Sequence, residues 1–124
     1  MRNQQMNGSR VHPTFGNYSI AVLKGNMLFM SGFGPFDIHQ QLVGDNIVDQ
    51  THQTMQNIRN FLEDNDFKMA DLVRCTVFLS DIGHWKPFNE VYGQYFEGTF
   101  PARTVVGCQL NQFLVEIECT AVKE

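Results

Sequence analysis

An arginine that follows a proline is the residue of this sequence best suited to bind an anion. Arg103 comes two residues after Pro101, at the start of an apolar run. Its planar guanidinium presents a fork of N–H donors that matches both oxygens of a carboxylate. Arg103 is therefore a candidate for gripping a small organic acid. From spacing alone, an exposed or structurally paired arginine is the commoner outcome.

A carboxylate near the C-terminus is the second candidate. Glu116 and Glu118 alternate with apolar residues along 113–122, so both lie on one side of an expected strand. A carboxylate beside a cation can orient water or carry protons. A solvated strand face is the simpler interpretation, and either glutamate could be the relevant acid. The spacing of Arg103 and Glu116 also suits a salt bridge between neighbouring antiparallel strands.

The sequence gives little support for a metal site, a dinucleotide-binding site or a disulfide framework. The four histidines are isolated from one another and from the cysteines, so we expect no metal site. Gly32-Phe33-Gly34 follows a strand pattern, but no third glycine or helix start follows it, which argues against dinucleotide binding. The cysteines form no Cys-x-x-Cys pair and are expected to be buried, reduced thiols of a cytoplasmic protein: Cys75, Cys108 and Cys119.

The 124 residues fit one domain, with a flexible segment at 1–12 and the domain proper at 13–124. The hydrophobic fraction is 43%, as in globular proteins, and a domain of this size gains from oligomerisation. The net charge is −4 and the nine basic residues are scattered, which makes nucleic acid an improbable main partner. We also expect no membrane span and no signal peptide.

Short apolar runs at 18–23 and 27–32, divided by a turn at 24–26, predict a β-hairpin. A loop or short edge strand is expected over 36–44. Helical spacing from Ile47 to Leu62, with Asp45 and Asn46 as candidate caps, predicts a helix that ends near 64–66.

Residues 73–80 alternate in the pattern of a strand. A second helix begins near Pro87, with Gly98 just past its end. Two final strands, 103–110 and 113–122, are joined by a tight turn at Asn111-Gln112. Together the elements predict an α+β fold in which two helices cover one face of a mixed sheet. The other face must then meet a partner subunit or water.

Several short motifs follow one another along the chain. They are Gly16-Asn17-Tyr18-Ser19, Ser31-Gly32, Asn57-Ile58, Asp71-Leu72-Val73, Thr76-Val77-Phe78-Leu79, Asn89 with Tyr92, Phe100-Pro101-Ala102-Arg103, and Val115-Glu116-Ile117-Glu118. In these motifs the chain resembles the Rid proteins, also called the YjgF or L-PSP endoribonuclease-like family. The resemblance spans nearly the whole chain after the first dozen residues, and its last two motifs are the most specific.

The resemblance implies a chorismate-mutase-like subunit that assembles into a homotrimer with a central β-barrel and clefts between subunits. It implies hydrolysis of 2-imino acids, or of their enamine tautomers, to 2-keto acids and ammonia, with no metal or organic cofactor. Arg103 would bind the substrate carboxylate, and Glu116 would position the attacking water. The other implied cleft residues are Tyr18, Ser31, Gly32 and Asn89.

Two residues depart from the family pattern. Phe33 stands where a glutamine commonly follows the Ser-Gly pair, and Val105 stands where a cysteine is frequent. The stretches on either side of Arg103 also look shorter than usual. These changes are expected to alter the cleft wall and therefore the range of substrates.

The leading hypothesis is a deaminase acting on 2-iminobutanoate and 2-iminopropanoate, or on another small enamine acid. The alternative from a different class is a non-catalytic trimer that binds small carboxylic metabolites and regulates partners. Cleavage of single-stranded RNA is a third hypothesis, disfavoured by the acidic balance of the chain.

Overall fold

The computed structural model describes residues 4–6 and 10–124. Of the segment expected to be flexible, positions 1–3 and 7–9 lie outside the described residues. Within the same segment, Gln4–Met6 forms a strand that the sequence analysis did not predict, and Val11 and His12 are buried. The domain boundary at residue 12 stays a prediction.

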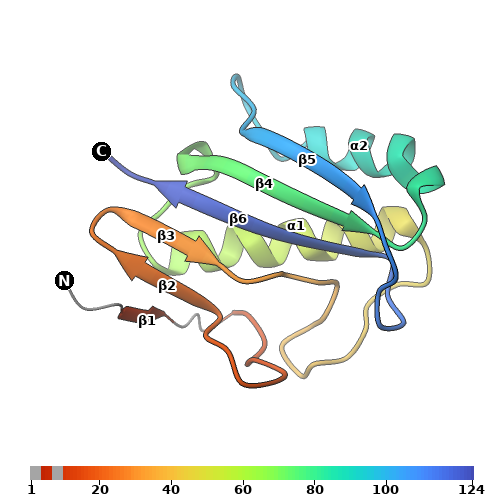
Figure 1. Cartoon of the computed structure of the whole chain (residues 1–124), viewed down its shortest axis with the longest axis horizontal. Helices are drawn as coiled ribbons and strands as arrows, with labels where there is room; N and C mark the ends of the chain where they lie inside the picture. The colour runs from red at the N-terminus through yellow and green to blue at the C-terminus, as the bar shows by residue number, and fades with distance from the viewer. Residues whose placement is uncertain (1–3, 7–9) are drawn as a thin grey trace.

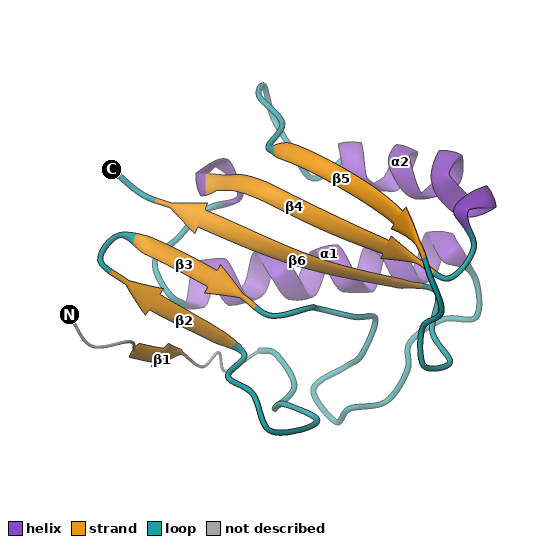
Figure 2. Cartoon of the chain, in the orientation of Figure 1, coloured by secondary structure: helices purple, strands orange, loops and turns teal. Residues whose placement is uncertain are grey.

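A six-stranded sheet lies against two helices, which cover one of its faces (Figures 1 and 2). The strand order is β1-β2-β3-β6-β4-β5, and every pairing is antiparallel except that of β4 with β5. The predicted α+β fold with helices on one face is confirmed. The elements are β1 (Gln4–Met6), β2 (Ala21–Lys24), β3 (Met27–Met30), α1 (Ile47–Asp64), β4 (Leu72–Leu79), α2 (Trp85–Gly93), β5 (Ala102–Gly107) and β6 (Val115–Val122).

The alternation of side chains along the two central strands divides the sheet into a buried and an open face. On β6, Val115, Ile117 and Cys119 are buried beneath the helices, whereas Glu116 and Glu118 lie on the open face. This follows from the two-residue repeat of a strand. The residues of β4 and the helices that complete the core are Cys75, Val77, Leu79, Met55, Ile58, Phe61, Leu62 and Phe88.

The predicted hairpin is confirmed as β2 and β3. The prediction that the last two strands are neighbours in the sheet is wrong. β4 lies between β5 and β6, so the expected salt bridge across adjacent strands cannot form. The reason is that α2 returns the chain to pair β5 in parallel with β4, which leaves only the far side of β4 for β6. Residues 108–114 then cross the end of β4, where Leu114 accepts a hydrogen bond from the Ser80 amide at 3.0 Å.

The first helix begins where the sequence predicts. The Asn46 side chain accepts a hydrogen bond from the Asp49 amide at 2.9 Å, which satisfies a free N–H group at the helix start. The second helix ends at Gly93, so the predicted end at Gly98 is wrong. Tighter turns follow instead, and through them Tyr95 and Phe96 pack against the core. Gly98 occupies a loop with a φ of +84°.

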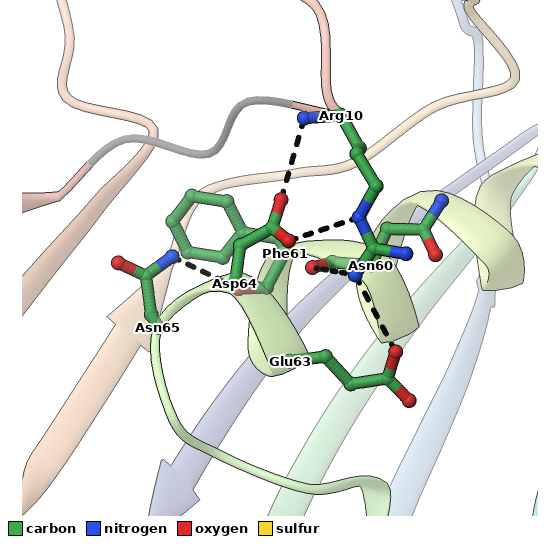
Figure 3. Close-up of polar contacts among 6 residues, drawn as sticks. All are labelled: Arg10, Asn60, Phe61, Glu63, Asp64 and Asn65. Atoms are coloured by element: carbon green, nitrogen blue, oxygen red, sulfur yellow. Dashed lines mark hydrogen bonds and ion pairs between the residues drawn. The ribbon is translucent and has the colours of Figure 1, made fainter.

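Arg10 attaches the chain before β2 to the C-terminal end of α1 (Figure 3). Its Nε donates to Asp64 Oδ1 at 2.9 Å, and its Nη2 donates to the Asn60 carbonyl at 3.2 Å and to Glu63 at 3.4 Å. The contacts are exposed and contribute little to stability. They fix the start of the segment 10–20, which passes beside the loop that follows β3.

Asn57 attaches that loop to the inner side of α1. Its side chain is buried, and its Nδ2 donates to the carbonyls of Gly34 and Phe36 at 3.0 and 2.8 Å. These carbonyls belong to a loop without regular strand partners, so a side chain must satisfy them. Asn57 thus places Phe36 with respect to the helix.

We expect Asn57→Ala to lower the free energy of unfolding by about 2 kcal/mol, because two buried carbonyls lose their donor. Equilibrium unfolding in urea measures the change. Gln56→Ala, at an exposed position of the same helix, is the matched control and should change stability by less than about 0.5 kcal/mol. Equal losses for the two variants would contradict this role of Asn57.

Candidate functional site

Arg103 lines a hollow of about 370 Å³ between β5 and α2. It is the second residue of β5, and its register partner on β4 is Cys75, which faces the helices. Arg103 therefore lies on the helix-covered side, at the outer edge of the sheet. The residues that line this hollow with it are Asn89, Tyr92, Gly93, Phe100 and Pro101.

The guanidinium of Arg103 is held in place without a carboxylate. Nη1 donates to Asn89 Oδ1 at 2.9 Å, and the guanidinium carbon lies 4.7 Å from the ring centre of Tyr92 and 5.7 Å from that of Trp85. Among the described residues, the ion pairs are those of Arg10. Arg103 thus keeps N–H donors and an uncompensated charge for an anionic ligand.

Glu116 lines a second hollow, of about 430 Å³, which shares no lining residue with the Arg103 hollow. Tyr18, Gly32 and the loop 109–111 line it too. Among the described residues no group donates a hydrogen bond to the Glu116 carboxylate. Burial raises the pKa of Glu116 above its usual value, and the neighbouring charge of Glu118 raises it further.

Gly32 allows the chain to pass directly over Glu116. A Cβ atom at position 32 would lie 2.6 Å from Glu116 Oε2, which is closer than such atoms approach in proteins. A side chain at position 32 would therefore push the Glu116 carboxylate out of its present position. The neighbouring Ser31 hydroxyl donates to the Ser19 carbonyl at 2.7 Å, and the Tyr18 hydroxyl accepts from the Phe15 amide at 3.2 Å. These bonds hold the segment 15–19 beside residues 31–32.

Aromatic side chains that the sequence analysis missed form one wall of the Glu116 hollow. Phe36 lies 4.9 Å from Phe15 and 5.3 Å from Phe113 between ring centres, and His12 lies 5.0 Å from Phe15. The rings come from three separate segments, so no local spacing shows that they meet. The high phenylalanine content, 11 of 124 residues, was the only available signal.

Phe33 does not line the cleft wall, so that expectation is wrong. Its side chain is 2% exposed and lies 5.5 Å from the ring of Phe61 in the core. Its backbone exchanges hydrogen bonds of 2.8 and 2.9 Å with Ile117, and directly paired residues share a side of the sheet. Since Ile117 faces the helices, Phe33 does so as well.

Val105 and Glu118 line neither of these two hollows. Val105 is half-buried, packs against the core and lies on the same side of β5 as Arg103. Glu118 belongs to a third hollow, of about 230 Å³, that contains Arg74 and Phe29. Of the two glutamates, Glu116 is thus the one that shares a hollow with Tyr18 and Gly32.

Arg103 and Glu116 do not meet within one chain. Arg103 lies on the helix-covered side of the sheet and Glu116 on the open side, with β4 between their strands. The structure brings Arg103 together with Asn89, and Glu116 together with Tyr18 and Gly32. A single site that contains both charged groups requires two chains.

Two kinds of feature are absent from the described residues. No group of three or more His, Cys, Asp or Glu side chains there could hold a metal ion. No helix in that part of the chain is long and apolar enough to cross a membrane.

The structure is a small α+β domain that carries an unpaired arginine on one side of its sheet and a half-buried glutamate on the other. The chain belongs to the family described as Endoribonuclease L-PSP, the Rid or YjgF family, whose sequence model matches residues 9–123. A RutC family protein of Pyrococcus horikoshii is 38% identical over 88% of this chain and 89% of its own length. Reactive Intermediate Deaminase A of Arabidopsis thaliana is 30% identical over 98% of this chain and 66% of its own length.

A solved structure of Escherichia coli TdcF with bound serine has the same fold. It superposes with a TM-score of 0.91 at 27% identity and covers 98% of this chain and 99% of that one. The family resemblance and the fold expected from it are confirmed.

We expect the free energy of unfolding to depend on pH through the titration of Glu116. Because its pKa is raised in the folded state, the folded chain holds this proton more tightly than the unfolded chain does. Its contribution to the free energy of unfolding therefore falls as the pH rises from about 4.5 through the raised pKa. Glu116→Gln should become more stable than the wild type as the pH rises, and the difference should be largest above the raised pKa.

Urea unfolding at a series of pH values from about 4 to 8 measures this difference. Glu90→Gln, at an exposed position of α2, controls for the loss of one carboxylate. A difference between Glu116→Gln and the wild type that stays constant across the series would show that the pKa is not raised.

Proposed function

We propose that the protein hydrolyses reactive 2-imino acids, such as 2-iminopropanoate and 2-iminobutanoate, to 2-keto acids and ammonia. The site proposed is a cleft between two subunits, to which one chain contributes Arg103 and the other Tyr18, Gly32 and Glu116. The observation that carries the proposal is the placement of a cation without a carboxylate partner and a half-buried carboxylate on opposite sides of one sheet. The proposed location is the cytoplasm.

The open face of the sheet supports assembly into a homotrimer. Met27, Phe29 and Val106 lie on it with more than a third of each side chain exposed. Exposed apolar groups gathered on one face are typical of a surface that another chain covers. The proposed reaction requires that this trimer bring the β5 edge of one copy beside the Glu116 hollow of the next.

The proposed chemistry needs few groups. The substrate R–C(=NH₂⁺)–COO⁻ reacts with water to give R–C(=O)–COO⁻ and NH₄⁺, so no electron acceptor takes part. The Arg103 fork grips the carboxylate and fixes the carbon in position. Glu116 takes a proton from the attacking water and returns it to the departing nitrogen. Asn89 is a positioning residue, because it acts through the Arg103 guanidinium.

The raised pKa of Glu116 supports its role in proton transfer. A general acid–base group works best when its pKa lies near the working pH, and burial moves that of Glu116 in this direction. The names of two relatives add support: one is a reactive intermediate deaminase, and the other holds serine, a small molecule with a carboxylate.

The two alternatives are weaker. A non-catalytic metabolite binder would use the same Arg103 grip, so turnover is what separates it from a deaminase. RNA cleavage matches the family's description. The net charge of −4 and the scattered basic residues do not favour a polyanion as substrate.

We expect Arg103→Ala to reduce kcat/KM for 2-iminopropanoate by at least about 100-fold, because charge-assisted hydrogen bonds to the carboxylate contribute about 3 kcal/mol. The kcat/KM of Arg103→Lys should lie between those of the wild type and Arg103→Ala, because lysine keeps the positive charge but cannot make the bidentate contact. The imines are generated in place by an amino-acid oxidase, and the uncatalysed rate is subtracted. Arg59→Ala, which removes a cation from α1 outside both hollows, is the control. No acceleration by the folded wild type would overturn the proposal.

We expect two inactive variants to restore activity when their subunits mix. Arg103→Ala and Glu116→Gln are unfolded together and refolded, and each is also refolded alone. The Glu116→Gln chain still has Arg103, and the Arg103→Ala chain still has Glu116. A cleft to which these two chains contribute those two residues is intact. Random assembly makes about a quarter of the clefts intact, so about a quarter of the wild-type rate should return. No recovery in stable mixed oligomers would mean that both groups act within one chain.

A further inference from the structure

The hollow beside Glu116 is much larger than a small imine requires. Its volume is about 430 Å³, within the range of pockets that hold drug-sized ligands. A methyl or ethyl side chain on the imine carbon would leave most of this space unused. The space lies on the side of Glu116 that adjoins the aromatic wall.

The wall is made of rings in contact with one another. The centre of Phe36 lies 4.9 Å from that of Phe15, 5.3 Å from that of Phe113 and 5.9 Å from that of His12. The tilted and edge-to-face geometries are those that aromatic pairs prefer. The loop that carries Phe36 is fixed by the buried amide of Asn57, so the wall has a defined shape.

His12 contributes a buried ring to this wall. Its Nδ1 lies 2.8 Å from the Pro13 carbonyl, which can only accept, so Nδ1 donates this hydrogen bond. The ring packs against Phe15 and Phe36. The wall therefore offers faces and edges of rings beside the Glu116 carboxylate.

Phe15 stands at the mouth of the hollow and is 52% exposed. A large aromatic side chain left half in water beside a cavity gains from being covered by a ligand. Phe15 is also one residue before the Gly16-Asn17-Tyr18 motif, and its amide donates to the Tyr18 hydroxyl. The aromatic wall is thus continuous with the proposed reaction site.

We propose that the substrate carries a large apolar side chain, aromatic by preference, and that the wall of His12, Phe15, Phe36 and Phe113 receives it. The inference rests on the proposed function and names its substrate class. For a phenyl side chain, 2-imino-3-phenylpropanoate and water give phenylpyruvate and ammonia. Carboxylate and imine lie between Arg103 and Glu116, and the ring extends into the hollow.

The expected preference follows from the apolar area removed from water. Burying a phenyl group instead of a methyl group favours the larger substrate by about tenfold or more in kcat/KM, a factor that corresponds to about 1.4 kcal/mol. The kcat/KM for the leucine-derived imine should lie between those for the phenylalanine- and alanine-derived imines, because its side chain is apolar but smaller than a phenyl ring.

The experiment compares kcat/KM for the imines of phenylalanine, leucine and alanine in the wild type, Phe15→Ala and Ile38→Ala. Phe15 is half exposed, so its truncation should leave the fold intact. Ile38 is 48% exposed in the loop after β3 and lines neither hollow, which makes its variant the matched control. We expect Phe15→Ala to reduce the phenylalanine-to-alanine ratio by at least threefold and Ile38→Ala to leave that ratio unchanged.

A binding measurement separates this inference from the proposed function. Calorimetric dissociation constants for phenylpyruvate and pyruvate are measured in the same three proteins. Hydrolysis of the alanine-derived imine with no preference for phenyl would overturn the inference and keep the deaminase. Hydrolysis of no imine would overturn the deaminase. In that case tighter binding of phenylpyruvate, weakened by Phe15→Ala, supports the aromatic wall, and equal binding of both acids overturns it.

Discussion

The strand β4, which lies between β5 and β6, is the constraint on which the rest of the structure depends. It pairs in parallel with β5 on one side and antiparallel with β6 on the other, and both registers are fixed by the apolar residues it buries. Through these registers Arg103 shares the side of Cys75, and Glu116 shares the side of Phe78. A slip of one residue between β4 and β6 would turn Glu116 toward the helices and Ile117 toward the open face. The same packing that stabilises the subunit thus separates its two charged groups.

This separation explains why a stable subunit can carry an unpaired cation and an unpaired carboxylate. If Arg103 and Glu116 met within one chain, they would neutralise each other and leave no charge for a substrate. Instead Arg103 is held by an amide and aromatic rings, which fix its orientation and keep its charge. Glu116 lies over Gly32 with no donor among the described residues, and burial raises its pKa. Each group thus remains without a partner of opposite charge among the described residues.

Local patterns in the sequence were enough to predict α1, the β2–β3 hairpin, β4 and the alternation along β6. Periodicity reports which side of an element is buried, and caps report where a helix starts. Periodicity does not report which strands pair, so the position of β4 between β5 and β6 could not be predicted. Phe33 was misplaced for a related reason, because only its pairing with Ile117 reveals that it faces the core. Gly98 was predicted to follow the end of the second helix, but that helix ends at Gly93 and Gly98 lies in the loop beyond it.

The aromatic wall shows why the candidate site was harder to predict than the fold. The scaffold superposes on TdcF with a TM-score of 0.91 at 27% identity, so many different sequences build it. Fold alone therefore says little about substrate. Phe15, Phe36 and Phe113 lie outside the helices and strands, on segments that can change without disturbing the sheet. In this chain those segments converge beside Glu116, so the strands set the positions of the two charged groups and the loops set the shape of the hollow beside one of them.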